Sequence, residues 1–305
     1  MNMHAPPQRT AAETALIEAF GARLSDLPGD GDVMVKRDAA IEAVKEGLPT
    51  RHVEAWHYTD LRRLLASVPS YDQAAHARPA DALLPHTSVL PVLNGAARGD
   101  APAIDGVTVR PVAEMLTDGS FAPALGRRDD DDTIGAINTA FVSDGWFVEV
   151  APGAVVETPI EVQNVLAGGQ AHVRFPVRVG DGATVTIVER QTGAGASFAS
   201  SVANLVVGKG AQVRWLIVQD LPETTSLLSQ FNAEIGEGAS LSLFLMNEGG
   251  KLIRQEVRVK AGGEHSDFQL RGVNLLSGDA HTDLTMVLDH SAPNAGSREL
   301  IRNVV

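Results

Sequence analysis

A short glycine phrase recurs at a near-constant interval in the second half of this chain. The second glycine of each copy follows the previous one by 29, 28 and 28 residues, and a degenerate copy follows after 24. A fixed period of this size is typical of stacked repeats, in which each unit buries its apolar face against its neighbours. The copies are Val150-Ala151-Pro152-Gly153-Ala154, Val179-Gly180-Asp181-Gly182-Ala183, Val207-Gly208-Lys209-Gly210-Ala211, Ile235-Gly236-Glu237-Gly238-Ala239 and Val259-Lys260-Ala261-Gly262-Gly263.

Apolar residues alternate with other residues on both sides of each phrase. Val177 and Val179 lead into the first full copy, and Val185 and Ile187 follow it. Period-two alternation predicts strands with one buried face, and glycine pairs supply the left-handed or close-packed backbone of a tight corner. Each repeat is therefore predicted as strand, corner, strand and a looser polar return. The returns are expected at residues 191–201 and 220–229.

Corners at a constant interval predict a mainly β fold with a parallel β-helix, or similar β-solenoid, as its core over residues 146–305. The alternative is a serial β-sandwich. Sandwich strands rarely repeat one corner phrase at one interval, so the solenoid is the preferred interpretation.

The first third of the chain is built differently. Thr10 and Glu13 have the spacing of a capping box, and the apolar pattern that follows predicts a helix reaching Leu27, before Pro28-Gly29. A second helix is expected around Ile41 and Val44, because glycine and proline stop signals follow. The expected organisation is a helical region at 1–85, a mixed α/β connecting segment at 86–145 and the core at 146–305.

Composition excludes several functional classes. The chain has no cysteine, which excludes disulfides, thiolate metal sites and a cysteine nucleophile within these residues. Its net charge of −13 argues against nucleic-acid or anionic-membrane binding. No apolar run is long enough for a membrane span, and the polar start at residues 1–9 lacks the apolar core of a signal peptide. A cytoplasmic protein is expected.

A dense cluster of large and charged residues lies at positions 48–61. His52 and His57 are five residues apart, so they do not share a helical face as metalloprotease histidines do. We expect a structural role, in which Trp56 and Tyr58 anchor the helical region while Arg51 and Glu54 form an ion pair.

Two further groups are candidate metal ligands. Asp129-Asp130-Asp131-Asp132 is acidic, but consecutive carboxylates cannot all face one ion, so a solvated loop favouring the next helix terminus is expected. His265 and His290 are separated by 25 residues, close to one repeat, whereas His281 does not fit the period. Two imidazoles without a third ligand hold iron or zinc poorly, so no catalytic, cofactor-binding or metal residue is assigned.

An ordered set of motifs covers nearly the whole chain. Together they resemble the SufB/SufD family of iron–sulfur cluster assembly proteins, and SufD more than SufB. The motifs are Pro49, Arg51, Glu54, Trp56, Tyr58, Thr59 and Leu61; Val92-Leu93-Asn94-Gly95; Ile137-Asn138-Thr139-Ala140-Phe141 with Asp144-Gly145; Glu157-Thr158-Pro159-Ile160; and His290-Ser291-Ala292-Pro293 with Ser297.

The resemblance implies a right-handed parallel β-helix preceded by helices, and a non-catalytic scaffold subunit of a SufBCD-type complex. As it implies, this chain pairs with SufB through sheet edges, the ATPase SufC supplies energy, and an iron–sulfur cluster forms only at a complex interface. A homodimer paired in the same way is an open alternative. The chain itself has no Walker-type loop, since Gly208-Lys209-Gly210 is a repeat corner.

The sequence departs from the family in one respect. Relatives continue through further coils, a Cys-x-His-Gly-Ala-Thr segment and a helical domain, whereas residues 299–305 read as a strand. We expect a truncated version of a longer protein, or an end covered by another subunit, and the family's interface histidine matches no residue here. The rival function is a β-solenoid enzyme acting on carbohydrate or acyl substrates. The sequence shows neither the six-residue period of such acyltransferases nor the export signal that extracellular lyases need.

Overall fold

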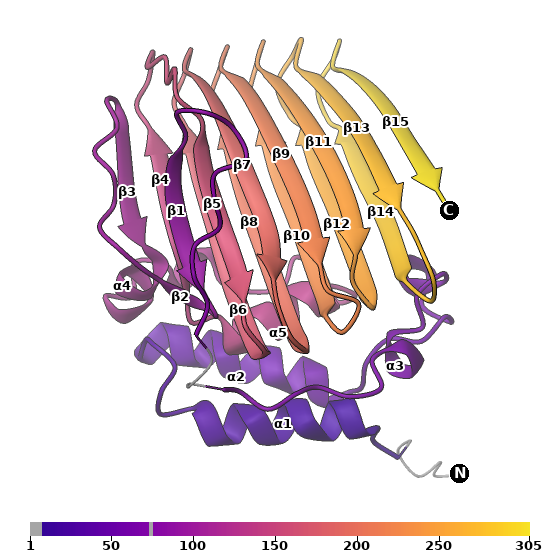
Figure 1. The fold of residues 1–305 in the computed structure, drawn as a ribbon. Helices are drawn as coiled ribbons and strands as arrows, with labels where there is room; N and C mark the ends of the chain where they lie inside the picture. Colours follow the sequence, from indigo (N-terminus) through magenta and orange to yellow (C-terminus); the bar gives the residue numbers. More distant parts are fainter. Residues whose placement is uncertain (1–7, 73–75) are drawn as a thin grey trace.

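The strands on either side of the glycine phrases form two long sheets in the computed structural model, which describes residues 8–72 and 76–305 (Figure 1). From β4 onward successive strands alternate between the sheets, and the pairings among these strands are all parallel. Sheet A holds β1 (Ser88–Leu93), β2 (Ala96–Ala97), β5 (Ile160–Leu166), β7 (Thr184–Gly193), β9 (Gln212–Leu221), β11 (Ser240–Gly249), β13 (Asp267–Leu275) and β15 (Gly296–Val304). Sheet B holds β3 (Val107–Pro111), β4 (Asp144–Val150), β6 (Gly169–Val179), β8 (Ser197–Val207), β10 (Ser226–Ile235), β12 (Leu252–Ala261) and β14 (His281–His290).

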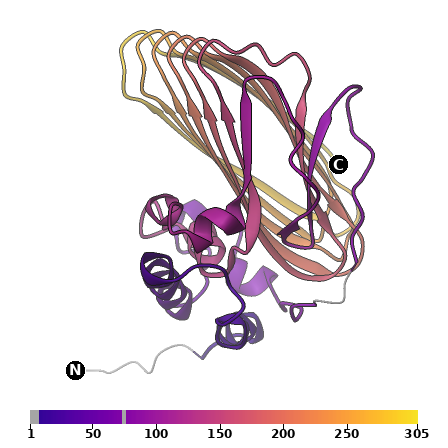
Figure 2. The same cartoon turned by 90° about the vertical axis from the view of Figure 1, so that its left-hand side faces the viewer.

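This arrangement confirms the mainly β solenoid preceded by helices. The serial sandwich is wrong, because the repeats contribute parallel strands to two sheets instead of antiparallel layers. Figure 2 shows the stacked coils edge-on, with corners aligned along one side of the solenoid.

The glycine corners stack through backbone hydrogen bonds. The Gly208 N–H donates to the carbonyl of Val179 at 2.8 Å, and Gly210 N–H donates to that of Glu237, also at 2.8 Å. The two glycines of a phrase have different roles. A Cβ on Gly208 would lie 2.7 Å from the backbone nitrogen of the corner below, whereas Gly210 has open space but a φ of +66°. Both features disfavour any side chain.

The fifth corner lies three residues later than the sequence pattern predicts. Gly263 takes the first glycine's place, because its N–H donates to Ile235, and His265 takes the left-handed place with φ of 59°. A sixth corner follows at Pro293-Asn294, where Asn294 has φ of 57°. The sequence pattern did not place these two corners, because histidine and asparagine stand where the other corners have a glycine with positive φ.

The predicted polar returns are mostly wrong. Strand β7 runs to Gly193 and β8 begins at Ser197, so only residues 194–196 turn; residues 222–225 form the next turn. The polar residues in these stretches lie inside the solenoid. Gln191 is fully buried and contacts Glu189 and Ser201 through hydrogen bonds of 2.9 Å.

An amide ladder accompanies the apolar core inside sheet A. One side-chain amide from each coil occupies the same register position. Asn274, for example, accepts a hydrogen bond from Asn247 and donates one to Asn303, both at 2.7 Å. Stacked amides of this kind stabilise parallel strands in register. The ladder consists of Asn164, Gln191, Gln219, Asn247, Asn274 and Asn303.

The helices gather at one end of the strands in both views (Figures 1 and 2). They share a hydrophobic cluster with outward residues of sheet B, including Phe198, Val202 and Leu228. Helix α5 contacts β6, β8 and β10, and α2 packs on α5. The α-helices are α1 (Ala11–Arg23), α2 (Gly31–Lys45), α3 (Leu61–Leu64), α4 (Val112–Thr117) and α5 (Thr133–Phe141), and the short 3-10 helices are η1 (Glu54–Trp56) and η2 (Ala122–Ala124).

The capping box at Thr10 and Glu13 is confirmed, and the helix that it starts is shorter than expected. It ends at Arg23, since the N–H groups of Asp26 and Leu27 turn back onto the Arg23 carbonyl. Leu24 is therefore 38% exposed. The second helix ends before Gly47, as predicted.

The division at residues 85 and 145 stays a prediction. Strands β1 and β3 of the connecting segment pair with β5 and β4 and so extend both sheets. Residues 1–7 of the polar start lie outside the described residues. None of the helices in residues 8–72 and 76–305 is long and apolar enough to cross a membrane.

Candidate functional site at the joint between the helices and sheet B

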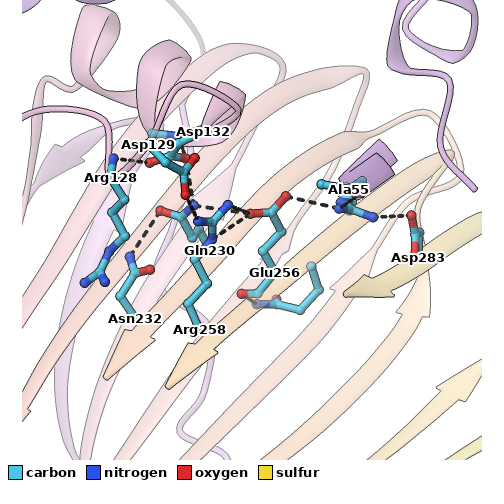
Figure 3. A network of polar contacts seen from close by, with 12 residues as sticks. Ala55, Arg128, Asp129, Asp132, Gln230, Asn232, Glu256, Arg258 and Asp283 are labelled. Atoms are coloured by element: carbon cyan, nitrogen blue, oxygen red, sulfur yellow. Dashed lines mark hydrogen bonds and ion pairs between the residues drawn. The ribbon is translucent and has the colours of Figure 1, made fainter. Parts of the chain in front are cut away.

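Charged side chains alternate along β12 and therefore share its outer face. Arg254, Glu256 and Arg258 all point away from the apolar interior. Figure 3 shows them meeting the loop before α5 on one side and the segment around Ala55 on the other. We call this polar network the joint, because it fastens two parts of the amino-terminal region to sheet B.

Asp132 connects α5 to the strands. Its side chain is 1% exposed and accepts hydrogen bonds from the backbone N–H of Gly135 at 2.8 Å and of Arg128 at 2.9 Å. Gln230 of β10 donates to the same carboxylate at 2.8 Å and to Glu256 at 3.3 Å. The helix cap is thus held directly by the sheet.

Arg254 is the buried cation of the joint. It is 1% exposed, and its guanidinium donates to the Ala55 carbonyl at 2.6 Å and to Glu256 at 3.1 Å. It also pairs with Asp283 of β14 and lies 4.6 Å from the centre of the Trp56 ring. Two carboxylates and a cation–π contact therefore compensate the burial of this charge.

Arg258 extends the network to the acidic loop. It donates to Glu256 at 3.1 Å and to Asp129 at 2.6 Å. Burial lowers the pKa of Arg258, but Glu256 and Asp129 outweigh burial and raise it above its ordinary value. The carboxylate of Glu256 thus bridges two arginines of one strand.

Thr59 and His281 complete the joint at β14. The Thr59 hydroxyl lies 3.0 Å from Nε2 of His281 and donates to Asp283. Burial lowers the pKa of His281, partly opposed by Asp283, and Arg254 lowers it further. The histidine is therefore a satisfied structural group, as expected.

A second buried arginine anchors α5 to β6. Arg174 is 2% exposed and donates to Asn138 at 2.7 Å, to Thr139 at 2.8 Å and to the carbonyl of Ala124 at 2.9 Å. Asn138 in turn donates to the carbonyls of Val173 and Ser200. Burial lowers the pKa of Arg174 to about 10, so it stays charged at neutral pH.

Arg37 of α2 holds the carboxy-terminal end of the same helix. It is fully buried and donates to the carbonyls of Thr139, Ala140 and Val142, at 3.2, 3.0 and 2.7 Å. These carbonyls at the end of α5 need donors, and a cation suits the negative end of the helix dipole. Burial, together with the nearby arginines at 174 and 23, lowers the pKa of Arg37 to about 10.

One buried carboxyl group lies inside the solenoid, away from the joint. Glu189 of β7 is 1% exposed and accepts hydrogen bonds from Gln191 at 2.9 Å, Ser201 at 3.1 Å and the Trp215 indole at 3.3 Å. Burial raises the pKa of Glu189, and these donors only partly oppose it.

The expectations for residues 51–58 are mixed. Trp56 is fully buried as predicted, but Tyr58 is 81% exposed and anchors nothing. The Arg51–Glu54 ion pair is also wrong, because no ion pair joins them in the structure, which describes both residues. Trp56 is held by Arg254 instead, from a strand about two hundred residues away.

The acidic run is only partly the solvated loop that was expected. Asp129, Asp130 and Asp131 are exposed, but Asp132 is buried as the cap of α5. His265 is an exposed corner residue near Glu264, and His290 lies 3.3 Å from the Ser297 hydroxyl. Among the described residues no three histidine or carboxylate side chains are grouped to hold a metal ion.

Comparison with known proteins agrees with this architecture. Residues 162–305 match the family model described as "SUF system FeS cluster assembly, SufBD core domain". An iron–sulfur cluster assembly SufBD family protein of Mycobacterium tuberculosis is 24% identical over 262 residues, which is 85% of this chain and 59% of that protein. SufB of Bacillus subtilis is 27% identical over 180 residues, which is 57% of this chain and 38% of that protein.

The SufBD core model, which matches nearly half of the chain, and these relatives support a place for the chain in the SufB/SufD family. It spans about three fifths of the length of the mycobacterial relative that it matches. The closer likeness to SufD stays a prediction, because the relatives include a SufB.

The family motifs now have physical roles. Asn138 and Thr139 hold Arg174, and Trp56 and Thr59 contact the joint at Arg254 and Asp283. In the motif ending at Gly95, Asn94 and Gly95 have φ of 47° and 85° and turn the β1–β2 hairpin. These residues fasten the amino-terminal region to the SufBD core.

Sequence reasoning did not find the arginines of the joint. One signal was present, since Arg254, Glu256 and Arg258 alternate within a strand and must share a face. Arg37 and Arg174 gave no such signal, because their acceptors are backbone carbonyls from distant segments.

Proposed function

We propose that this chain is a non-catalytic scaffold subunit of a SufBCD-type iron–sulfur cluster assembly complex in the cytoplasm. The observation that carries the proposal is the SufBD core domain matched to residues 162–305, which coincide with most of the stacked solenoid. The absence of cysteine and the family motifs at the joint support a structural role for this chain.

We propose that pairing with a SufB-type subunit uses sheet edges on the β14 and β15 side of the solenoid. In the described chain, β14 pairs only with β12, and β15 pairs only with β13. Alternate residues of β15 direct their backbone groups to β13, since Gly296 N–H donates to Ser266 and the Val304 carbonyl accepts from Leu276. The backbone groups of Glu299 and Ile301 therefore face away from β13, toward the carboxy-terminal side of the solenoid, and suit pairing with a further strand.

The joint suits the mechanical part of this role. An ATPase of the SufC type would drive a movement that the solenoid transmits. Hydrogen bonds from Arg254 to the Ala55 carbonyl and from Gln230 to Asp132, together with the Arg258–Asp129 ion pair, bind the helical region to sheet B, so the two parts move together. The iron–sulfur cluster is cargo in this proposal and forms at the interface with the partner, with ligands that this chain does not supply alone.

The test is co-expression of the full-length protein with the SufB-type and SufC-type proteins of the same organism. We expect a stable complex, iron–sulfur absorption that requires the partners, and no turnover of sugars or acyl donors. Glu299→Pro removes a backbone donor that faces away from β13 and should weaken pairing, whereas Arg298→Ala on the same strand should not.

Two outcomes would contradict different parts of the proposal. If the three proteins do not co-purify, the assembly role is wrong. If they co-purify equally with Glu299→Pro, pairing through this edge is wrong.

A further inference from the structure

The outer face of sheet A has an unusual composition over its last four strands. The strands β9, β11, β13 and β15 are in register, so their outward residues form rows across the sheet. The three central rows hold twelve residues, of which six are apolar and four are arginine; Ser242 and Gln269 are the other two. We call these rows the basic apolar face.

The apolar members of this face are accessible. Phe244 is 38% exposed and Leu300 is 52% exposed, whereas the inward residues Leu243 and Leu245 of the same sheet are nearly fully buried. Monomeric proteins rarely expose contiguous apolar surface without a use for it. The apolar members are Leu216, Val218, Phe244, Met246, Val273 and Leu300.

The four arginines are also without partners. Arg214, Arg271, Arg298 and Arg302 are exposed, and none forms a hydrogen bond or ion pair with the described part of the chain. The rows contain no acidic residue, although the whole chain has 38 acidic residues against 25 basic ones. A local excess of unpaired cations in an acidic protein favours an acidic ligand.

The chain itself covers the neighbouring part of this sheet. Residues 80–83 lie across β5 and β7, where Leu83 N–H donates to Glu161 at 2.8 Å and Arg190 donates to the Asp81 carbonyl at 2.6 Å. Val188, in the same row as Phe244, is consequently fully buried. From β9 onward no described segment lies across the outward residues in this way, and their exposure rises.

The composition distinguishes a protein ligand from a nucleic acid. Aromatic residues, methionine and arginine are enriched in protein interfaces, whereas lysine is depleted, and this face has no lysine. A nucleic acid would meet the net charge of −13 around the face.

We propose that the basic apolar face is a docking surface for an acidic, amphipathic segment of a partner protein. The apolar residues of that segment would cover Phe244 and Leu300, and its carboxylates would pair with the surrounding arginines. This surface is distinct from the sheet edges used for SufB-type pairing, so its occupation does not depend on that proposal.

The test measures binding by the full-length protein with fluorescence anisotropy. The probe is a short labelled peptide in which glutamate alternates with leucine and phenylalanine. The comparisons are the same peptide with lysine for glutamate, and a labelled oligouridylate. We expect the acidic peptide alone to bind, and the double variant Arg271→Glu, Arg298→Glu to weaken binding by about tenfold or more, because it reverses two contacts.

Lys260→Glu is the matched control. It makes one such charge reversal on the outer face of sheet B, where Lys260 is exposed, and should leave binding unchanged. Circular dichroism melting of all variants separates loss of binding from loss of folding. Phe244→Ser, at an exposed position, gives a second test of the apolar contact.

Several results would overturn the proposal. One is equal binding of the acidic peptide by the double variant and by Lys260→Glu. Another is tighter binding of oligouridylate. Self-association through this face in sedimentation, or no peptide binding because another part of the full-length protein covers the face, would also contradict an acidic partner.

Discussion

The two sheets of the solenoid have similar inner faces and very different outer faces. On sheet B, Arg254 and Glu256 are covered by the amino-terminal region and are at most 3% exposed. On sheet A, Arg271 and Phe244 have no such cover. The same strand alternation thus produces a structural joint on one side and an accessible surface on the other. Because Arg254 and Glu256 are buried and paired, their removal should cost far more than the removal of exposed charges on the outer face of sheet A.

The largest expected effect is that of Arg254→Ala. The substitution leaves Asp283 and Glu256 without their shared cation and removes the contact with Trp56. We expect a loss of about 3–5 kcal/mol in the free energy of unfolding, measured with urea. Lys260→Ala, an exposed change on the same strand and face, should change it by less than about 0.5 kcal/mol. Similar losses for the two variants would remove the distinction between the faces.

Asn138→Ala tests the second anchor of the amino-terminal region, where Arg174 holds α5 on β6. Arg174 would lose its 2.7 Å acceptor, and the carbonyls of Val173 and Ser200 would lose a donor, all in a buried setting. We expect a loss of about 2 kcal/mol in unfolding free energy. Ser242→Ala on the open face is the control, and hydrogen exchange should show α5 losing protection before β6. Loss of protection in both elements together would mean that this anchor does not act as a separate unit.

Glu189→Gln tests the cost of a carboxyl group that is buried inside sheet A without a cationic partner in the described chain, in contrast to the ion pairs of the joint. Burial raises the pKa of Glu189 in the folded protein above its ordinary value of 4.5. As pH rises above that value the unfolded chain loses its proton first, so the wild type loses stability until pH passes the folded-state pKa. The glutamine variant lacks this loss.

We therefore expect the stability of Glu189→Gln relative to wild type to increase from acidic to neutral pH. Thermal melting of both proteins at a series of pH values measures this difference. The substitution also removes the carboxylate that accepts from the Trp215 indole, which changes the stability difference by the same amount at every pH. The dependence of that difference on pH is therefore the quantity to compare. Glu234→Gln, at an exposed position on sheet B, is the control. A flat difference would show that Glu189 titrates normally.

The smallest expected effect is that of Arg271→Ala. This arginine is exposed and makes no polar contact in the described chain, so unfolding free energy should change by less than about 0.5 kcal/mol. The melting temperature is the measurement. A loss comparable to that of Arg254→Ala would show that the outer face of sheet A is part of a packed interior in the full-length protein.

The sequence by itself determined the repeating part of this protein. A period of 28 or 29 residues, with glycines at the corners and alternating apolar residues, leaves few ways to bury those residues other than stacked coils. The capping box at Thr10 and the turn at Asn94-Gly95 are equally local, so they too could be predicted. Even the amide ladder was visible as an amide every 27 to 29 residues.

Only the tertiary structure decided what covers each outer face. Strand alternation separates inward from outward residues. It does not tell that Arg254 is buried and Arg271 is exposed, because both are outward residues. Arg254 is buried because Ala55 and Trp56, remote in sequence, fold onto it, whereas no described segment reaches Arg271. The physical reason is that burial of an outward charge depends on long-range packing and on the partners that this packing supplies, and neither is encoded in a local period.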